Sequence, residues 1–166
     1  LKQASNLLLV IGKTGGHLDQ SLFARDILSE KNGPPPEINL FNEKNNGETI
    51  LKLIDKKFVK AAHDVSLGGI ITALSKMCII GKKGVILKKP NYLINKFEYL
   101  FGEDQGRYII EINKDDFQEI GRAHVWTPVT VNNLVCRLLL EKKKKQQQNT
   151  QRRYDNITHI SDTYSQ

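Results

Sequence analysis

The sequence has few of the features that mark disulfide scaffolds, metal modules and membrane proteins. Its 166 residues include two cysteines, one methionine and one tryptophan, and aromatic residues make up 7%. Cys78 and Cys136 lie far apart, so they form neither a disulfide framework nor a metal-binding spacing. No run approaches the roughly 20 apolar residues that a membrane helix needs. We therefore expect a reduced, cytoplasmic protein without membrane association.

The beginning of the chain has neither an initiating methionine nor a signal peptide. Leu1 is not preceded by a methionine, and the first residues show no signal-peptide pattern, so we expect a piece of a longer protein. The length allows about one domain with a hydrophobic core. The hydrophobic fraction of 39% lies above that of disordered chains.

The positive charge is concentrated near the end of the sequence. The net charge is +7, and the residues from 119 onward hold 8 basic against 4 acidic side chains. The dense basic run, 142–145, is followed by three glutamines and has no interleaved aromatic residue. No helix-turn-helix, zinc-finger or RNA-stacking motif accompanies it, so nucleic-acid binding is not expected.

The order of apolar segments predicts a layered α/β domain. The continuous apolar run 7–11 is typical of a strand buried on both faces. Helices are expected to alternate with strands throughout, until the pattern stops near residue 118. The expected strands are 7–11, 59–63, 84–87 and 107–112, and the expected helices are 20–30, 47–58, 70–80 and 91–100, with one more helix opening at 115–118.

Residues 120–141 resemble the translation of a sequencing-library adapter. Positions 120–130 match one constant arm of a common short-read adapter, and positions 134–141 match the other after a gap of index length. Lys142 to Lys145 then correspond to a run of A bases, and Trp126 to a TGA codon read as tryptophan. We predict a natural domain over residues 1–118, which lacks its last elements, and a non-native or disordered tail over 119–166. A genuine basic C-terminal tail is the alternative.

The segment 63–69, His-Asp-Val-Ser-Leu-Gly-Gly, lies between an expected strand and an expected helix. Glycines at a helix start allow close backbone approach, and free N–H groups there favour a phosphate. We therefore predict a nucleotide- or phosphate-binding loop. Asp64 is a candidate Mg²⁺ ligand and Ser66 a candidate cap or phosphate donor. The alternative is an ordinary capped turn, with His63 packed at the edge of the sheet. The candidate residues are His63, Asp64, Ser66, Gly68 and Gly69.

Two other loops follow or precede expected strands. Gly12-Lys13-Thr14 suggests a nucleotide loop, but Leu7 stands where a Walker motif needs its upstream glycine, so we reject that motif. The segment 101–107, Phe-Gly-Glu-Asp-Gln-Gly-Arg, leads into a strand, and a polar turn with a salt bridge is its simplest interpretation.

Six segments in order resemble one enzyme family, bacterial phosphoribosylformylglycinamidine synthase. They are 8–14, 16–22, 33–36, 46–47, 63–69 and 101–108, and the resemblance covers about residues 6–118. It implies a C-terminal-type layered α/β domain of the aminoimidazole ribonucleotide synthase superfamily, truncated here. It also implies a fragment of the ligase that uses ATP, Mg²⁺ and glutamine-derived ammonia to convert formylglycinamide ribonucleotide to its amidine.

The same resemblance implies what the fragment does and does not carry. The family's catalytic histidines lie upstream, so no catalytic residue is assigned here and His63 is not a base. ATP, formylglycinamide ribonucleotide and a glutaminase partner are implied through the parent enzyme, and the fragment alone is expected to be inactive. Two positions depart from the family: Leu67 replaces a usual Asp, which puts metal binding in doubt, and Asp19 replaces a usual Gly.

Three functions remain in competition at this stage. The first is the purine-biosynthetic ligase, of which this chain is a piece. The second is a non-catalytic scaffold or interaction domain of that complex, or another ATP-dependent member of the superfamily. The third, a basic nucleic-acid-binding protein, needs an affinity that survives removal of residues 119–166.

Overall fold

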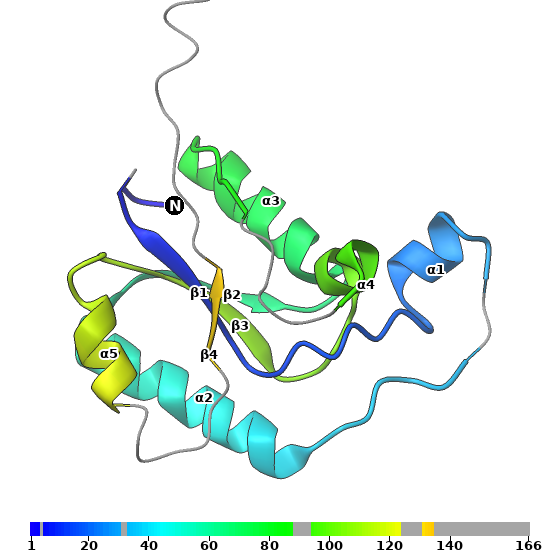
Figure 1. Ribbon diagram of the computed structural model, residues 1–166, viewed down its shortest axis with the longest axis horizontal. Coiled ribbons are helices and arrows are strands. Elements are labelled where there is room, and N and C mark those ends of the chain that lie inside the picture. The colour runs from blue at the N-terminus through cyan, green and yellow to red at the C-terminus, as the bar shows by residue number, and fades with distance from the viewer. Residues whose placement is uncertain (4, 31–32, 88–93, 124–130, 135–166) are drawn as a thin grey trace, which may run out of the picture.

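A four-stranded antiparallel sheet lies between two helical layers (Figure 1). The computed structural model describes the chain except for residues 4, 31–32, 88–93, 124–130 and 135–166. The strand order is β2-β3-β1-β4. The strands are β1 (Leu7–Ile11), β2 (Val59–Val65), β3 (Arg107–Ile112) and β4 (Val131–Leu134).

The central strands β1 and β3 are buried on both faces, as predicted for 7–11. Leu8 and Val10 enter one hydrophobic cluster, whereas Leu9 and Ile11 enter the other. Side chains alternate between the faces of a strand, so each face must be covered by its own layer of helix. The pairing is antiparallel throughout, which shows that burial on both faces does not require parallel strands.

Each face of the sheet is covered by a different pair of helices (Figure 1). The first cluster includes buried residues of α3 (Gly69–Gly81) and of α4 (Lys96–Phe101). The second includes residues of α2 (Leu40–Asp55) and of α5 (Phe117–Ala123). The short α1 (Leu22–Asp26) lies beside α4, where Phe23 stacks on Phe101 with ring centroids 4.6 Å apart. The predicted layered α/β class is confirmed.

Three helices differ in extent from the prediction. The helix expected over 91–100 begins at Lys96, as α4, and positions 91–93 lie outside the described residues. The helix expected over 20–30 is limited to five residues, because Gln20 and Ser29 both have positive φ and Ser21 caps the first turn. The helix expected to begin at 47 begins at Leu40, where the Asn39 side chain accepts a hydrogen bond from the Asn42 N–H. Its first turns have Leu40 and Phe41 exposed and then the polar run 42–46, so no apolar stripe reveals them.

The strand expected over 84–87 is wrong. In the described part of the chain this segment joins no strand ladder. Val85 and Leu87 instead pack against the first hydrophobic cluster, while Ile86 is more exposed. The segment has the alternation of a strand, but helices α3 and α4 already cover that face of the sheet, and it packs onto their cluster.

The predicted boundary at residue 118 falls inside α5. Ile120, in that helix, is buried in the second cluster. Strand β4 pairs with β1 and also lies beyond the boundary. The rest of the predicted tail, 124–130 and 135–166, lies outside the described residues, so the adapter interpretation stays a prediction.

A buried carboxylate fixes the N-terminal segment to the sheet. Glu111 in β3 is fully buried, and its oxygens accept hydrogen bonds from the Lys2 N–H at 2.7 and 2.9 Å, the Gln3 N–H at 2.9 Å and the Asn6 side-chain amide at 2.8 Å. A buried charge is tolerated where donors satisfy it in this way.

Replacing Glu111 with alanine is expected to lower the free energy of unfolding by about 3 kcal/mol, because the buried Asn6 amide and two partly buried backbone N–H groups lose their acceptor. Thermal unfolding by circular dichroism measures the change. Glu48→Ala is the matched control, since Glu48 is half-exposed and holds only long ion pairs. Equal melting temperatures for the two variants would contradict the assigned role.

The thiol of Cys78 provides a second test of packing. Cys78 lies in α3 against the first cluster, and burial raises the pKa of its thiol. In a Cys136→Ser background, we expect iodoacetamide to alkylate Cys78 more slowly in the folded chain than in urea at pH 8, because only the thiolate reacts. Equal rates in the two conditions would show that the helix does not pack as described.

Candidate functional site

The predicted loop 63–69 lies at the end of the edge strand β2. The His63 ring is 24% exposed and its Nδ1 lies 2.6 Å from the Asp64 carbonyl oxygen and 3.3 Å from the Asp64 carboxylate. The Asp64 side chain is 63% exposed, and Ser66 and Leu67 are exposed as well. The structure therefore brings His63, Asp64 and Ser66 to one end of the sheet with their polar groups near solvent.

The two glycines of this loop face inward. The Gly68 N–H donates to the Glu103 carboxylate at 2.8 Å, and the Gly69 N–H donates to the Ser66 carbonyl at 3.0 Å. A Cβ on Gly69 would lie 2.7 Å from the Leu100 carbonyl oxygen, and its φ is +69°. Gly69 thus allows close packing of α3 on the end of α4.

Asp64 has His63 beside it but belongs to no cluster of three metal-ligating side chains in the described residues. Nowhere in that part of the chain do three His, Cys, Asp or Glu side chains gather in a way that suits a metal ion. Mg²⁺ takes oxygen ligands at near-octahedral geometry. The exposed Asp64 carboxylate offers oxygen ligands of the kind that Mg²⁺ prefers. On its own it does not make a complete magnesium site.

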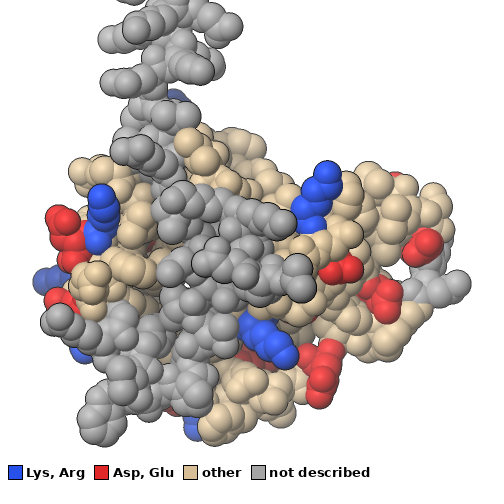
Figure 2. Space-filling view, in the orientation of Figure 1, with Lys and Arg blue, Asp and Glu red and all other residues tan. Residues whose placement is uncertain are grey.

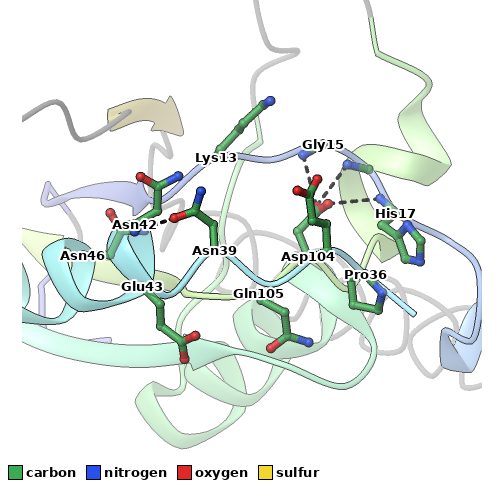
Figure 3. A pocket seen from close by; sticks show the side chains of 12 residues that line it. Lys13, Gly15, His17, Pro36, Asn39, Asn42, Glu43, Asn46, Asp104 and Gln105 are labelled. Carbon is green, nitrogen blue, oxygen red and sulfur yellow. Dashed lines mark hydrogen bonds between the residues drawn. The ribbon is translucent and has the colours of Figure 1, made fainter. Parts of the chain in front are cut away.

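A second polar region surrounds residues 12–17, the loop that follows β1. The Asp104 carboxylate accepts hydrogen bonds from three consecutive backbone N–H groups, those of Gly15 at 3.1 Å, Gly16 at 3.0 Å and His17 at 3.2 Å (Figure 3). Such a run of N–H groups is an anion-binding arrangement. Here the chain's own carboxylate occupies it, which agrees with the rejection of a Walker motif.

The Arg107 side chain holds the Asp104 turn in place. The guanidinium is fully buried, and its Nη1 lies 3.5 Å from the Asp104 carboxylate. The same side chain donates to the Gly102 carbonyl at 2.6 Å and to the Asp104 carbonyl at 3.1 Å. The salt bridge predicted for the 101–107 turn is confirmed, but it is buried, so it positions the turn more firmly than an exposed pair would.

This turn connects both loops. Glu103 accepts hydrogen bonds from the N–H groups of Gly68 and Leu22, each at 2.8 Å. Asp104, the next residue, binds the loop that follows β1. Two adjacent carboxylates therefore tie the 63–69 loop, the start of α1 and the 12–17 loop to one turn.

A cavity of about 450 Å³ lies between the 13–17 loop, the start of α2 and the 104–105 turn (Figure 3). Its lining is mainly polar. The residues are Lys13, Gly15, Gly16, His17, Pro36, Glu37, Asn39, Asn42, Glu43, Asn46, Asp104 and Gln105. None of the candidate residues of the 63–69 loop lines it, so sequence reasoning missed it. The sequence did contain one signal for this cavity. The polar run 42–46 contains no hydrophobic residue that a core would need.

The surface charges of the described residues are mixed. Figure 2 shows acidic and basic side chains interspersed over the face in view. None of the helices in the described part is long and apolar enough to cross a membrane.

Comparison with known proteins places this fold. Residues 3–123 match the family described as "AIR synthase related protein, C-terminal domain". The chain belongs to this family. The match confirms the superfamily that the sequence resemblance indicated.

Individual relatives of this AIR synthase C-terminal domain are similar in sequence or fold. Over 118 residues, 71% of the chain, it is 86% identical to "Phosphoribosylformylglycinamidine synthase subunit PurL" of Pelagibacter ubique, of which the chain spans 16%. The solved structure of T. maritima PurL complexed with FGAR has a TM-score of 0.67 at 21% identity, covering 83% of this chain and 24% of that one. T. maritima PurL complexed with ATP has a TM-score of 0.59 at 19% identity, covering 85% and 23%.

The two departures from the family pattern have different consequences. The left-handed residue in the turn at Asp19 is Gln20, so this turn does not need a glycine at position 19. Leu67 is 63% exposed beside Asp64 and Ser66. The loop therefore carries an apolar surface at the position where the sequence resemblance implies a carboxylate.

Replacing Asp104 with alanine is expected to release the 15–17 backbone, because its three N–H groups lose their acceptor. Hydrogen exchange of these amides should accelerate by about tenfold or more. Asp104→Asn keeps one acceptor oxygen, so its exchange rates are expected to lie between those of the unchanged chain and those of Asp104→Ala. Unchanged exchange at Gly15, Gly16 and His17 in Asp104→Ala would contradict this arrangement.

Proposed function

We propose that this domain is part of an ATP-dependent ligase that converts formylglycinamide ribonucleotide to formylglycinamidine ribonucleotide in purine biosynthesis. The 86% identity to the Pelagibacter ubique subunit carries this proposal. In it, ammonia comes from glutamine through a glutaminase partner, and the enzyme is cytoplasmic. The chain spans about one sixth of that relative, so the domain acts as a part of the whole subunit and is inactive alone.

In this proposal the 63–69 loop faces a bound nucleotide or phosphate. Ser66 and Asp64 are exposed and can reach a ligand, which supports their roles as phosphate donor and Mg²⁺ ligand. Gly68 and Gly69 contribute through the backbone shape of the helix start. His63, held by the Asp64 carbonyl, shapes the loop and takes no proton in the reaction. Bound Mg²⁺ supplies charge neutralisation of the phosphates.

A non-catalytic scaffold is the second candidate. The inward-facing glycines and the exposed Leu67 favour it, since both suit packing as well as ligand binding. The two candidates differ in whether the exposed polar side chains of the loop matter for the reaction.

A chimeric enzyme separates these candidates. Residues 3–118 of this chain replace the matching part of the Pelagibacter ubique subunit, and ATP- and glutamine-dependent formation of the amidine is measured. We expect activity within about threefold of the parent, and a loss of about tenfold or more in kcat/KM for ATP in Asp64→Asn and Ser66→Ala. Glu48→Gln is the control and is expected to be neutral.

Two results would change the conclusion. A chimera that folds and assembles but has no activity contradicts the ligase proposal. Full activity in the chimera and in both loop variants supports the scaffold instead.

A further inference from the structure

We propose that the cavity beside the 13–17 loop binds a small ligand with many hydroxyl or amide groups and one anionic group, the chemistry of a pentose phosphate. The choice of a ribosyl compound rests on the proposed function, whose substrate is a ribonucleotide. The exclusion of polyphosphate rests on the charges and contacts of the cavity alone.

Three consecutive backbone N–H groups of the loop already have an acceptor. The N–H groups of Gly15, Gly16 and His17 all donate to Asp104, and the His17 ring lies 3.0 Å from the Pro34 carbonyl. The run of N–H groups at 15–17 is therefore closed to a phosphate, and we assign the phosphate to a side chain. Lys13 is the cation among the described lining residues, and it is exposed.

The remaining charges oppose a polyphosphate. Glu37 and Glu43 line the same cavity, and neither carboxylate has a hydrogen-bond or ion-pair partner in the described residues. With one lysine against two free carboxylates, a ligand with three or four negative charges meets net repulsion. A single phosphate can lie at Lys13 while hydroxyl groups donate to the carboxylates.

The other lining groups suit hydroxyl and amide partners. The side chains of Asn42 and Gln105 also lack partners within the described part of the chain, and each offers both a donor and an acceptor. The described lining contains no Phe, Tyr or Trp on which a purine base stacks. A volume of about 450 Å³ is in the range of sites for small ligands.

The test is titration of the isotope-labelled 166-residue chain with ribose 5-phosphate, and separately with ATP in the absence of Mg²⁺ so that ATP keeps its full negative charge, followed by amide NMR. We expect shifts confined to residues 13–17, 36–46 and 104–105, with weaker binding of ATP at these positions. Lys13→Ala and Glu43→Ala are each expected to weaken ribose 5-phosphate binding by about tenfold. Lys44→Ala and Glu48→Gln are the matched controls for the loss of a lysine and of a glutamate. Both residues lie in α2, as Glu43 does, but neither lines the cavity.

The outcomes separate this inference from the proposed function. Ribose 5-phosphate that shifts none of these residues, or shifts only 63–69, overturns the inference, as does tighter binding of ATP in the cavity. Binding by the chain together with an inactive chimera leaves the cavity proposal standing while the ligase proposal fails. An active chimera without binding at the cavity does the reverse.

Discussion

Two adjacent carboxylates organise one end of this domain. Glu103 holds the N–H groups of Gly68 and Leu22, and Asp104 holds those of the 15–17 loop. The buried Arg107 fixes the turn that carries both. Charge-assisted hydrogen bonds of this kind are stronger than neutral ones, particularly where solvent is excluded. The candidate loop and the cavity are therefore built on the same short turn.

Hydrophobic pattern predicted the parts of the fold that the core determines. Strand 7–11 was found from its short continuous apolar run and strand 107–112 from its alternating character, whereas the helix over 70–80 was found because its apolar residues repeat at the helical period. The first turns of α2 were missed, since Asn42 to Asn46 are polar and the helix there begins at a side-chain cap. Gly47, which marked a helix start in the sequence, lies in the interior of that helix. The misleading strand 84–87 alternates because one side of it packs on a helical cluster.

The candidate site shows the same division. The His63–Gly69 loop was chosen from its residue types and its place between a strand and a helix, and the structure exposes Asp64 and Ser66. Its role in ligand binding stays a prediction. The cavity and Glu111 were not predictable, because both depend on residues distant in sequence: Asp104 meets Gly15, and Glu111 meets Lys2. Local sequence does not encode such pairings, so only the fold reveals them. Missed polar stretches are often where function or strain is located.

Strand β2 ends the sheet on one side, and this position has a consequence for the protein's behaviour in concentrated solution. In the described part of the chain, no strand pairs with its outer side. An edge of this kind presents every second backbone N–H and C=O to any other extended segment, including that of a second molecule. Lys60, near the start of β2, is the type of residue that discourages such addition, because a charged side chain is costly to bury between stacked strands. Conditions that neutralise or remove that charge favour self-association through this edge.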